Sequence, residues 1–294
     1  MAFSLLQDIV AAAQAEGKPF WRIVLEENCR EQDCSEETAI ETMAGMYRAM
    51  EEADRNYGPE MRSVSGMAGG DGEKLRQYRN SGSGMLGPYL DEVVEKAVKM
   101  AESNACMRRI VAAPTAGSCG VIPAVLLTYE RQRAVLREQM IEALFTAAGI
   151  GEVIACSASI AGAEGGCQAE IGAASAMAAG ALVQLEGGSL EAICHGAALA
   201  LKSLLGLTCD PVAGLVEVPC IKRNASGAVI AVTAAQMALA GIRSAVPPDE
   251  VVDSMRRIGK LIPGCLRETG LEGLATTPTA QRVAKALKAG GPDV

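Results

Sequence analysis

The chain has 294 residues, a net charge of −8 and a composition that is 49% hydrophobic but only 3% aromatic. This length allows one large domain or two small ones, with room for a sizeable core. The negative charge and the lack of a long basic run argue against nucleic acid as a partner, because phosphate binding needs a positive footprint.

The N-terminal stretch 1–17 argues against export. It lacks a basic region and carries Asp8, so it is a poor signal peptide. The longest apolar stretch, 171–185, is shorter than the ~18 residues expected of a membrane span. We therefore expect a cytoplasmic protein whose ten cysteines are reduced, with metal or catalytic use for some of them. Plain packing suits those flanked by Ala or Ile, which are Cys106, Cys156 and Cys194.

Hydrophobic spacing typical of helices recurs along the chain. Strand patterns are almost absent, and an Ala-rich, aromatic-poor core suits closely packed helices. The sequence thus predicts an all-α fold, a single Ala- and Gly-rich helical catalytic domain over residues 1–294 with Cys-bearing turns between its helices. The expected helices cover roughly 3–16, 20–30, 36–57, 89–103, 121–147, 149–160, 168–186, 189–206, 225–244, 248–261 and 278–290.

The segment 58–88 differs in texture from the rest. It contains GPEMRSVSGMAGGDG and NSGSGMLGP, which are too rich in Gly and Ser for a regular element. We expect either a linker or a mobile functional loop within the domain, because loose segments of this length in a compact chain are usually functional or mobile.

Four Gly-, Ser- or Pro-rich turns break helix rules where a helix would form easily. They are NSGSGMLGP (80–88), APTAGSCG (113–120), SIAGAEGGCQAE (159–170) and TCDPVAGLVEVPC (208–220). Three of the four contain a cysteine, so we expect the chemistry of this protein in these turns.

The second turn opens a helix and carries two hydroxyls, Thr115 and Ser118. Backbone N–H groups at a helix start, with hydroxyls nearby, form a site for a carboxylate or phosphate, although such a turn also serves as a plain N-cap. The first turn has the same two interpretations. Its hydroxyls, on Ser81 and Ser83, would bond either to a ligand or to the loop itself.

The last two turns place three cysteines in stiff or close-packed backbone. Glycines precede Cys167, which lies between Glu164 and Glu170, and let the backbone approach a bulky group. A helix N-terminus there would lower the pKa of the thiol and favour the thiolate. Cys209 is followed by Asp-Pro and Cys220 is preceded by Pro, and these prolines fix the backbone. We expect these three thiolates to hold a metal group.

Three thiolates leave two kinds of metal site open. Structural zinc normally takes a fourth protein ligand, and local CxxC pairs, which often supply it, are absent from the sequence. An iron–sulfur cluster for electron transfer typically takes four cysteines. A cluster on three cysteines has one open iron, which can act as a Lewis acid on a substrate hydroxyl. The pattern therefore favours a cluster that performs chemistry such as dehydration.

Several long stretches closely resemble the alpha subunit of the iron–sulfur-dependent L-serine dehydratase (L-serine ammonia-lyase) family. They are SGSGMLGPY, VAAPTAGSCGVIPAVLL, SASIAGAEGGCQAEIGAASAMAAGALVQL and LGLTCDPVAGLVEVPCIKRNASGAV. They occur in the family's order, and the resemblance runs from about residue 60 to residue 290.

The resemblance implies a [4Fe–4S] cluster on Cys167, Cys209 and Cys220, whose separations of 42 and 11 residues are similar to the family's. It implies conversion of L-serine to pyruvate and ammonia without pyridoxal phosphate, oxygen sensitivity and a cytoplasmic location. We expect the turn with Thr115, Gly117 and Ser118 to bind substrate. Two further hydroxyls are candidate catalytic proton relays, those of Ser81 and Ser83.

The chain departs from the family pattern in two ways. It lacks the beta portion of full-length members, so either a separate beta subunit completes the enzyme or the chain is incomplete as a catalyst. Some members carry a C-terminal cysteine that caps the open iron. The tail KALKAGGPDV has none, so we expect another group or water in that position.

Two other functions remain open at this point. One is a related lyase on the same scaffold, such as a cysteine desulfidase, and the other is a non-catalytic metal-bearing assembly subunit. The only histidine, His195, follows Cys194 in an apolar run and is expected to be structural. The cations after Cys220 are Lys222 and Arg223, which would either balance the cluster's charge or stay solvated.

Overall fold

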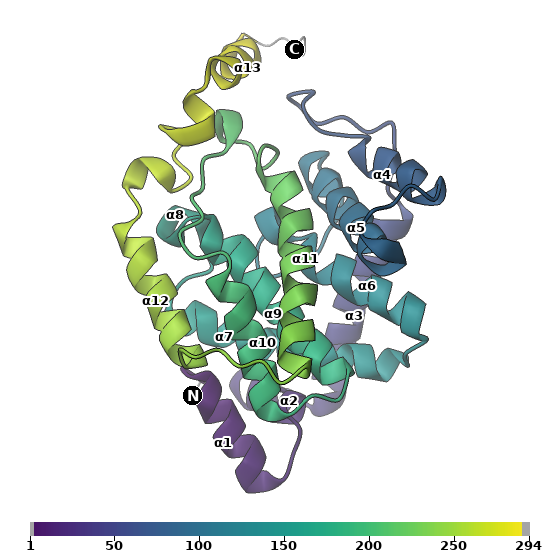
Figure 1. Ribbon diagram of the computed structural model, residues 1–294, viewed down its shortest axis with the longest axis vertical. Coiled ribbons are helices and arrows are strands. Elements are labelled where there is room, and N and C mark those ends of the chain that lie inside the picture. The colour runs from purple at the N-terminus through teal and green to yellow at the C-terminus, as the bar shows by residue number, and fades with distance from the viewer. Residues whose placement is uncertain (1–2, 290–294) are drawn as a thin grey trace.

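The computed structural model describes residues 3–289, and the all-α prediction is confirmed (Figure 1). The α-helices are α1 (Leu6–Glu16), α2 (Phe20–Gln32), α3 (Glu36–Arg55), α4 (Asp71–Asn80), α5 (Gly87–Ala105), α6 (Val121–Arg133), α7 (Arg137–Ser157), α8 (Gly162–Gly165), α9 (Ala173–Leu185), α10 (Leu190–Lys202), α11 (Cys220–Leu239), α12 (Pro248–Leu261) and α13 (Pro278–Lys288). The shorter elements are the 3₁₀ turns η1 (Ala116–Ser118), η3 (Val212–Gly214), η4 (Gly264–Leu266) and η5 (Gly273–Thr276), and the π-helical turn η2 (Gln168–Gly172). Within residues 3–289, β structure is limited to one isolated bridge.

Helix α9 runs through the middle of the bundle, where it packs against α6, α7, α10 and α11 (Figure 1). Every residue from Ala173 to Val183 is buried. Small side chains let the neighbouring helices approach closely: a Cβ at Gly180 would lie 2.2 Å from Cδ1 of Ile150 on α7. Since protein interiors are close-packed, an Ala- and Gly-rich α9 fixes where the surrounding helices, and the turns between them, must lie.

Two predicted segments differ from the structure. Helices were expected over 121–147 and 149–160, but the break falls at residues 134–136, between α6 and α7. Ala134 there has a φ of 50°, the left-handed conformation that ends helices. The loop prediction for 58–88 is wrong for residues 71–80, which form α4. The Gly-rich stretch before α4 supplies the left-handed N-cap, Gly70.

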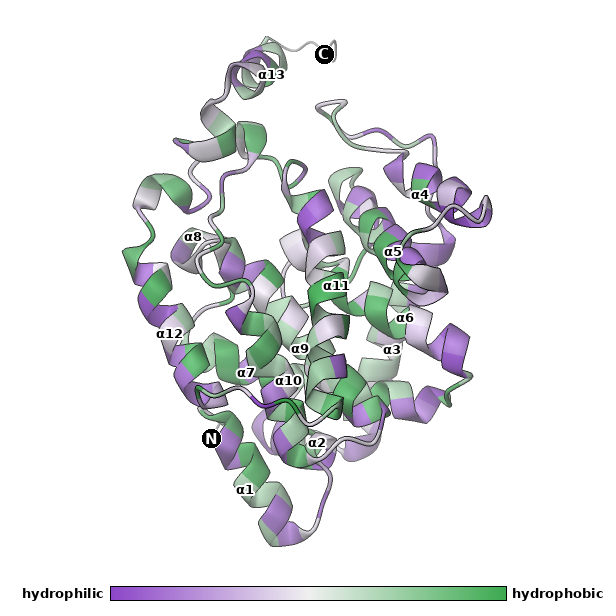
Figure 2. Ribbon diagram, in the orientation of Figure 1, coloured by the Kyte–Doolittle hydropathy of each residue, from purple (hydrophilic) through white to green (hydrophobic). Residues whose placement is uncertain are grey.

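Hydrophobic residues concentrate in the central helices, and hydrophilic ones in outer helices such as α4 (Figure 2). The largest cluster of buried hydrophobic residues runs from Leu6 to Met255. Among the described residues, α7 alone has the length and apolarity of a membrane span, and 67% of that stretch is buried inside the protein. This burial is what a core helix requires.

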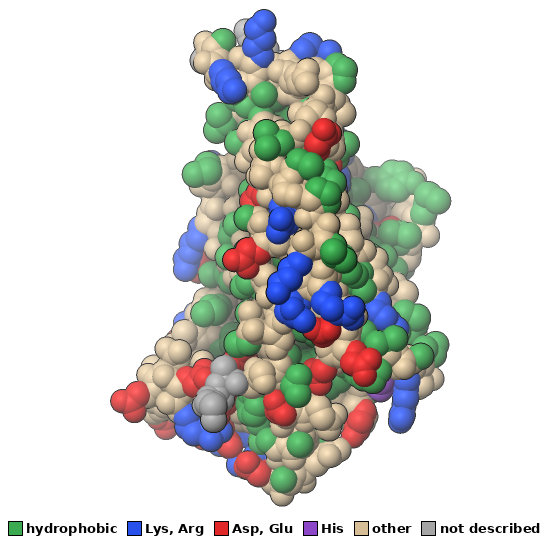
Figure 3. Space-filling view, turned by 90° about the vertical axis from the view of Figure 1, so that its left-hand side faces the viewer, with side chains coloured by type: hydrophobic (Ala, Val, Ile, Leu, Met, Phe, Trp, Pro, Cys, Tyr) green, Lys and Arg blue, Asp and Glu red, His purple; other side chains and the backbone are tan. Residues whose placement is uncertain are grey.

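Helix α12 lies on the flank of the bundle that faces the viewer in Figure 3, where Lys and Arg side chains gather near the middle of the surface. Its outer face pairs Arg256 and Arg257 with Asp253. Its inner face contacts the Cys167 turn, because Gln168 Nε2 donates a hydrogen bond to the backbone oxygen of Met255. Helix α12 therefore supports the cysteine-bearing turn from outside.

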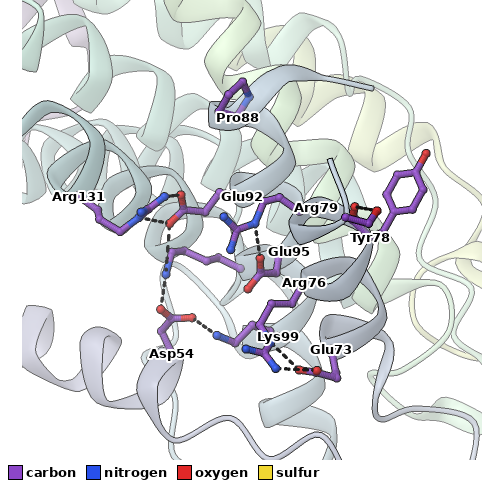
Figure 4. A network of polar contacts seen from close by, with 12 residues as sticks. Asp54, Glu73, Arg76, Tyr78, Arg79, Pro88, Glu92, Glu95, Lys99 and Arg131 are labelled. Atoms are coloured by element: carbon purple, nitrogen blue, oxygen red, sulfur yellow. Dashed lines mark hydrogen bonds and ion pairs between the residues drawn. The ribbon is translucent and has the colours of Figure 1, made fainter. Parts of the chain in front are cut away.

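A network of ion pairs joins α3, α4, α5 and α6 on the other side of the molecule (Figure 4). Asp54 of α3 bonds to two lysines of α5, Lys96 and Lys99, the second at 2.7 Å. All three side chains are less than a fifth exposed. Burial by itself raises the pKa of the Asp54 carboxyl, but the two lysine charges outweigh it and hold this pKa below its usual range.

We expect the substitution Asp54→Asn to lower the free energy of unfolding by about 2 kcal/mol at pH 7, since a charged, hydrogen-bonded partner is lost. Because the folded-state pKa of Asp54 is lowered, its contribution is fully present above the unfolded pKa of about 3.9 and is lost as pH falls through the folded value. Urea titrations of both proteins from pH 7 to pH 3 should show the difference shrinking. A difference that grows on acidification would contradict this assignment.

Candidate functional site

Three of the four predicted turns meet in the structure, namely 113–120, 159–170 and 208–220. Thr115 Oγ1 donates a hydrogen bond to Glu170 Oε1 at 2.7 Å, which joins the first turn to the second. Glu170 Oε2 lies 4.0 Å from Cys209 Sγ, which joins the second to the third. The Glu170 side chain is therefore the point where the three turns come together.

The three predicted ligands are all buried, with relative exposures of 2% for Cys167, 2% for Cys209 and 5% for Cys220. Cys167 directly precedes the π-helical turn η2, and Cys220 is the first residue of α11. π-Helical turns inside helices are rare and recur at functional sites, where they re-aim side chains. Each thiol thus projects from a helix start or a tight loop into the protein interior.

Burial dominates the electrostatics of these thiols. It raises the pKa of Cys167 to about 11, despite the nearby Arg223 charge, which lowers it. Burial, Cys167 and Glu170 raise the pKa of Cys220 to about 12. The pKa of Cys209 is also raised, by burial and by Cys167, Glu170 and Cys220. The three thiols therefore interact with one another.

The expectation of a lowered thiol pKa at Cys167 is wrong for the metal-free protein. Removal of the side chain from water disfavours the thiolate more than the neighbouring helix start favours it. Metal ligands must be deprotonated, so binding a metal group here would release protons.

The donor set, three cysteines with no histidine among them, has the ligand chemistry of an iron–sulfur site. Within the described part of the chain, no three Cys, His, Asp or Glu side chains converge on one ion position. In an iron–sulfur cluster each cysteine binds a different iron, so the three sulfurs need only surround a shared volume. Soft thiolates, and no histidine among them, also suit iron–sulfur groups.

Cys209 is held by backbone bonds on both sides. Its N–H donates to Leu266 O at 2.9 Å, and its carbonyl accepts from Glu268 N at 2.7 Å. Further along the same loop, Val212 N donates to Val218 O at 2.9 Å. Together with the prolines of the loop, these bonds fix the backbone position of Cys209 independently of any bound group.

Arg223 lies between the cysteines and an acidic partner. Its guanidinium donates to Asp210 Oδ1 at 3.0 Å and to Thr208 O at 2.7 Å. Its charge also lowers the pKa of the nearby Cys167 thiol, against the effect of burial. Asp210, only 6% exposed, accepts a further bond from Leu274 N. Arg223 is thus a partly buried cation placed to balance thiolate charge.

Glu217 ties the segment 58–70 to the cysteine loop. This carboxylate is 3% exposed and accepts hydrogen bonds from Ser63 Oγ and Ser65 Oγ. It lies three residues before Cys220. Part of the Gly-rich stretch is therefore structural, since its serines hold the turn that precedes the third cysteine.

The predicted substrate turn is both an N-cap and a neighbour of the cysteines. Thr115 and Ser118 form a reciprocal capping box around η1, with their oxygens 3.1 Å apart. The buried Asn224 of α11 donates to Gly117 O at 2.8 Å. A Cβ at Gly117 would lie 2.7 Å from Glu170 Oε1, so glycine is required for the turn to approach that carboxylate. Substrate binding by this turn stays a prediction.

Ser81 and Ser83 lie elsewhere. Helix α5 has 19 residues, about 28 Å of rise, and its last turn contacts η1 through Asn104 Nδ2 and Ala116 O. The two serines precede its first turn, at the opposite end. The Ser81 hydroxyl donates a hydrogen bond to Ser83 Oγ at 3.0 Å, so these hydroxyls bond to the loop itself. The structure does not bring them to the cysteines, and their catalytic role stays a prediction.

His195 is also remote. It lines a surface cavity with Ala238 and Leu239 at the end of α11, whereas Cys220 begins that helix of 20 residues, about 30 Å long. Its Nδ1 accepts from Ser244 N at 3.2 Å, and burial lowers its pKa. A structural role accounts for these contacts.

From the sequence, Glu170 and Arg223 were named without a definite role in the site. Three polar side chains that hold the site together were not identified. These are Asp210, Glu217 and Asn224, all buried. The sequence feature that could have identified them was their closeness to the third cysteine. Asp210 and Glu217 lie within the ten residues before it, and Asn224 lies four residues after it. Polar residues in a Pro- and Gly-rich turn are usually read as solvated, so that signal was weak.

Comparison with known proteins gives consistent matches. Residues 15–275 match the family described as serine dehydratase alpha chain. The L-serine dehydratase alpha chain of Peptoniphilus asaccharolyticus is 41% identical over 278 residues, covering 94% of this chain and 95% of that protein. The probable L-serine dehydratase alpha chain of Bacillus subtilis is 53% identical over 228 residues, 78% of this chain and 76% of that protein. L-serine dehydratase TdcG of Escherichia coli is 47% identical over 190 residues, but these cover only 41% of its length.

Proposed function

The chain belongs to the serine dehydratase alpha chain family, and on this premise we propose that it is the iron–sulfur-bearing subunit of an L-serine dehydratase. The proposed reaction converts L-serine to pyruvate and ammonia. The names of the similar proteins support the substrate and the reaction. The donor set described above supports the cofactor.

One observation carries the proposal: the turn 113–120 is joined through the Glu170 side chain to the loop of Cys209, one of the three buried cysteines. Thr115 and Cys209 both contact Glu170, one at each carboxylate oxygen. A substrate held by the turn would therefore lie beside a group held by the cysteines.

Cys167, Cys209 and Cys220 would hold a [4Fe–4S] cluster, with Arg223 offsetting part of its negative charge. When bound, this cluster supplies a Lewis acid that makes the serine hydroxyl a better leaving group. All ten cysteines are free thiols, which accords with a reducing compartment such as the cytoplasm.

The chain's own residues would orient the amino acid. The Thr115 hydroxyl donates to Glu170, so its oxygen keeps lone pairs that accept a hydrogen bond, for instance from the substrate ammonium. The Ser118 hydroxyl lies beside it, almost fully buried, where it is able to donate to a substrate carboxylate. Ser118 is buried and Thr115 is partly buried, and the exclusion of water strengthens such contacts.

The base that removes the Cα proton is assigned to a separate beta subunit. His195 is remote, and the serines of the 80–88 turn lie at the far end of α5. The printed names of the relatives as alpha chains support a second chain, as does the greater length of the Escherichia coli relative, of which this chain matches 41%.

The experiment measures iron, acid-labile sulfide and zinc per chain after anaerobic reconstitution, followed by pyruvate formation from L-serine with a candidate beta chain added. We expect about four irons and four sulfides per chain and activity that needs both chains. L-cysteine as substrate tests for a desulfidase. Zinc without sulfide, or a cluster-loaded complex inert toward serine, would refute the proposal.

A further inference from the structure

Glu170 has an environment that its role in packing does not explain. The side chain is 9% exposed and lies in the π-helical turn directly after Cys167. Its hydrogen bonds are those with Thr115 and Cys209, and within residues 3–289 it forms no ion pair with Lys, Arg or His. An ionised carboxylate in the interior needs a cationic partner or several strong donors. This one has a single hydroxyl donor and one weak thiol.

The two carboxylate oxygens have different surroundings. Oε1 is occupied, because it accepts the bond from Thr115 Oγ1 at 2.7 Å. Oε2 faces the thiols and is 4.0 Å from Cys209 Sγ. That thiol contact is the one hydrogen-bonding partner of Oε2 among the described residues.

Two glycines leave space for this carboxylate from opposite turns. A Cβ at Gly117 would lie 2.7 Å from Oε1, and a Cβ at Gly162 would lie 2.8 Å from Oε2 and 3.3 Å from Cys209 Sγ. A side chain at either position would require the Glu170 carboxylate to shift. Both turns therefore leave room for a carboxylate in this place.

Building on the proposed function, we propose that Glu170 is the fourth protein ligand of the iron–sulfur group, with Oε2 bound to the iron that lacks a cysteine. The structure favours this role over a purely structural one because Oε2 lies 4.0 Å from Cys209 Sγ, the carboxyl forms no ion pair among residues 3–289, and two glycines leave room for it beside the cysteine turns. A carboxylate is a harder and weaker ligand for iron than a thiolate. It would protect the iron at rest and still give way to the serine hydroxyl. No electrons move in this exchange of one oxygen ligand for another.

The test measures retention of the fourth iron without serine. Wild type and Glu170→Gln are reconstituted anaerobically, iron and sulfide are counted, and ferricyanide is then added as a one-electron oxidant. Formation of a three-iron cluster is followed by electron paramagnetic resonance. We expect both proteins to start with about four irons and Glu170→Gln to lose one iron at least about tenfold faster than wild type. Loss of a residue that supports a metal ligand lowers metal affinity on this scale.

Three further variants separate a ligand from a structural residue. Glu164→Gln changes a carboxylate on the same turn that bonds only to Ser159, and it should lose iron at the wild-type rate. Thr115→Val frees Oε1 but keeps Oε2, and it should retain iron far better than Glu170→Gln. Glu170→Asp keeps a carboxylate on a side chain one methylene shorter, and its rate of iron loss should fall between those of wild type and Glu170→Gln. If Glu170→Gln assembles no cluster, the comparison of Glu170→Asp with wild type provides the test.

The outcomes distinguish the two proposals. Equal iron loss in wild type, Glu170→Gln and Glu170→Asp would overturn the ligand role and leave the cluster intact as a proposal. Equal loss in Thr115→Val and Glu170→Gln would reduce Glu170 to a positioning residue for the turn. A wild-type protein that binds no iron and sulfide would refute the proposed function itself, and this inference with it.

Discussion

Replacement of Cys209 by Ala is expected to abolish assembly of the iron–sulfur group and to reduce pyruvate formation by more than about 100-fold. Loss of a residue that only supports a ligand typically costs 10–100-fold in metal affinity or activity, and loss of a ligand itself should exceed that. The Cys209 backbone is fixed by Leu266 and Glu268, so the substitution should leave the loop in place and remove only the sulfur. Iron, sulfide and pyruvate assays of the purified complex measure the effect.

The matched control is Cys194→Ala. Cys194 is 5% exposed on α10 and is packed among hydrophobic residues, so its substitution removes one buried sulfur of the same kind. It should lower stability by about 1 kcal/mol and leave the iron content unchanged. If Cys209→Ala keeps its full iron and sulfide, or if Cys194→Ala loses them, the ligand assignment is wrong.

The second large effect, a loss of stability, is expected from the substitution Glu102→Ala. Glu102 of α5 is fully buried and accepts hydrogen bonds from Tyr57 Oη and from the backbone N–H groups of Gly69, Asp71 and Gly72. These N–H groups open α4, where an anion is favoured by the helix dipole. The substitution leaves one buried and three partly buried donors unsatisfied, at up to about 1–3 kcal/mol for each. We expect the free energy of unfolding to fall by about 3–5 kcal/mol.

Urea unfolding measures the change, and hydrogen exchange locates it. Exchange should rise first in residues 58–72, the segment that Glu102 holds. Glu52→Ala is the control, because Glu52 is half exposed and makes one ion pair, with Arg109, so its loss should change stability by less than about 1 kcal/mol. A Glu102→Ala protein within 1 kcal/mol of wild type, with unchanged exchange in 58–72, would show that solvent satisfies these donors.

The fourth-ligand inference bears on an expectation raised by the sequence alone. From the sequence, either another group or water was expected at the iron that lacks a cysteine. Glu170 was visible in the sequence as one of two glutamates around Cys167. Only its placement against Thr115 and Cys209 distinguishes it from Glu164, which bonds to Ser159 at the protein surface.

Sequence by itself determined the helical class and the three cysteines as a set. Hydrophobic spacing repeats with the helical period, and small residues dominate 173–183, so helices and their close packing follow from local chemistry. The cysteine turns stood out because glycine and proline there oppose the helix that the flanking residues favour. These properties are short-range, because they depend on residues that are neighbours in the sequence.

Tertiary structure alone decided which turns meet. The 80–88 turn and the 113–120 turn have similar composition, yet α5 holds them at opposite ends and only the second reaches the cysteines. The thiol pKa of Cys167 also depended on burial by distant segments rather than on its helix start. Contacts between residues far apart in the chain depend on how the helices pack around α9, and no local pattern of residues encodes that arrangement.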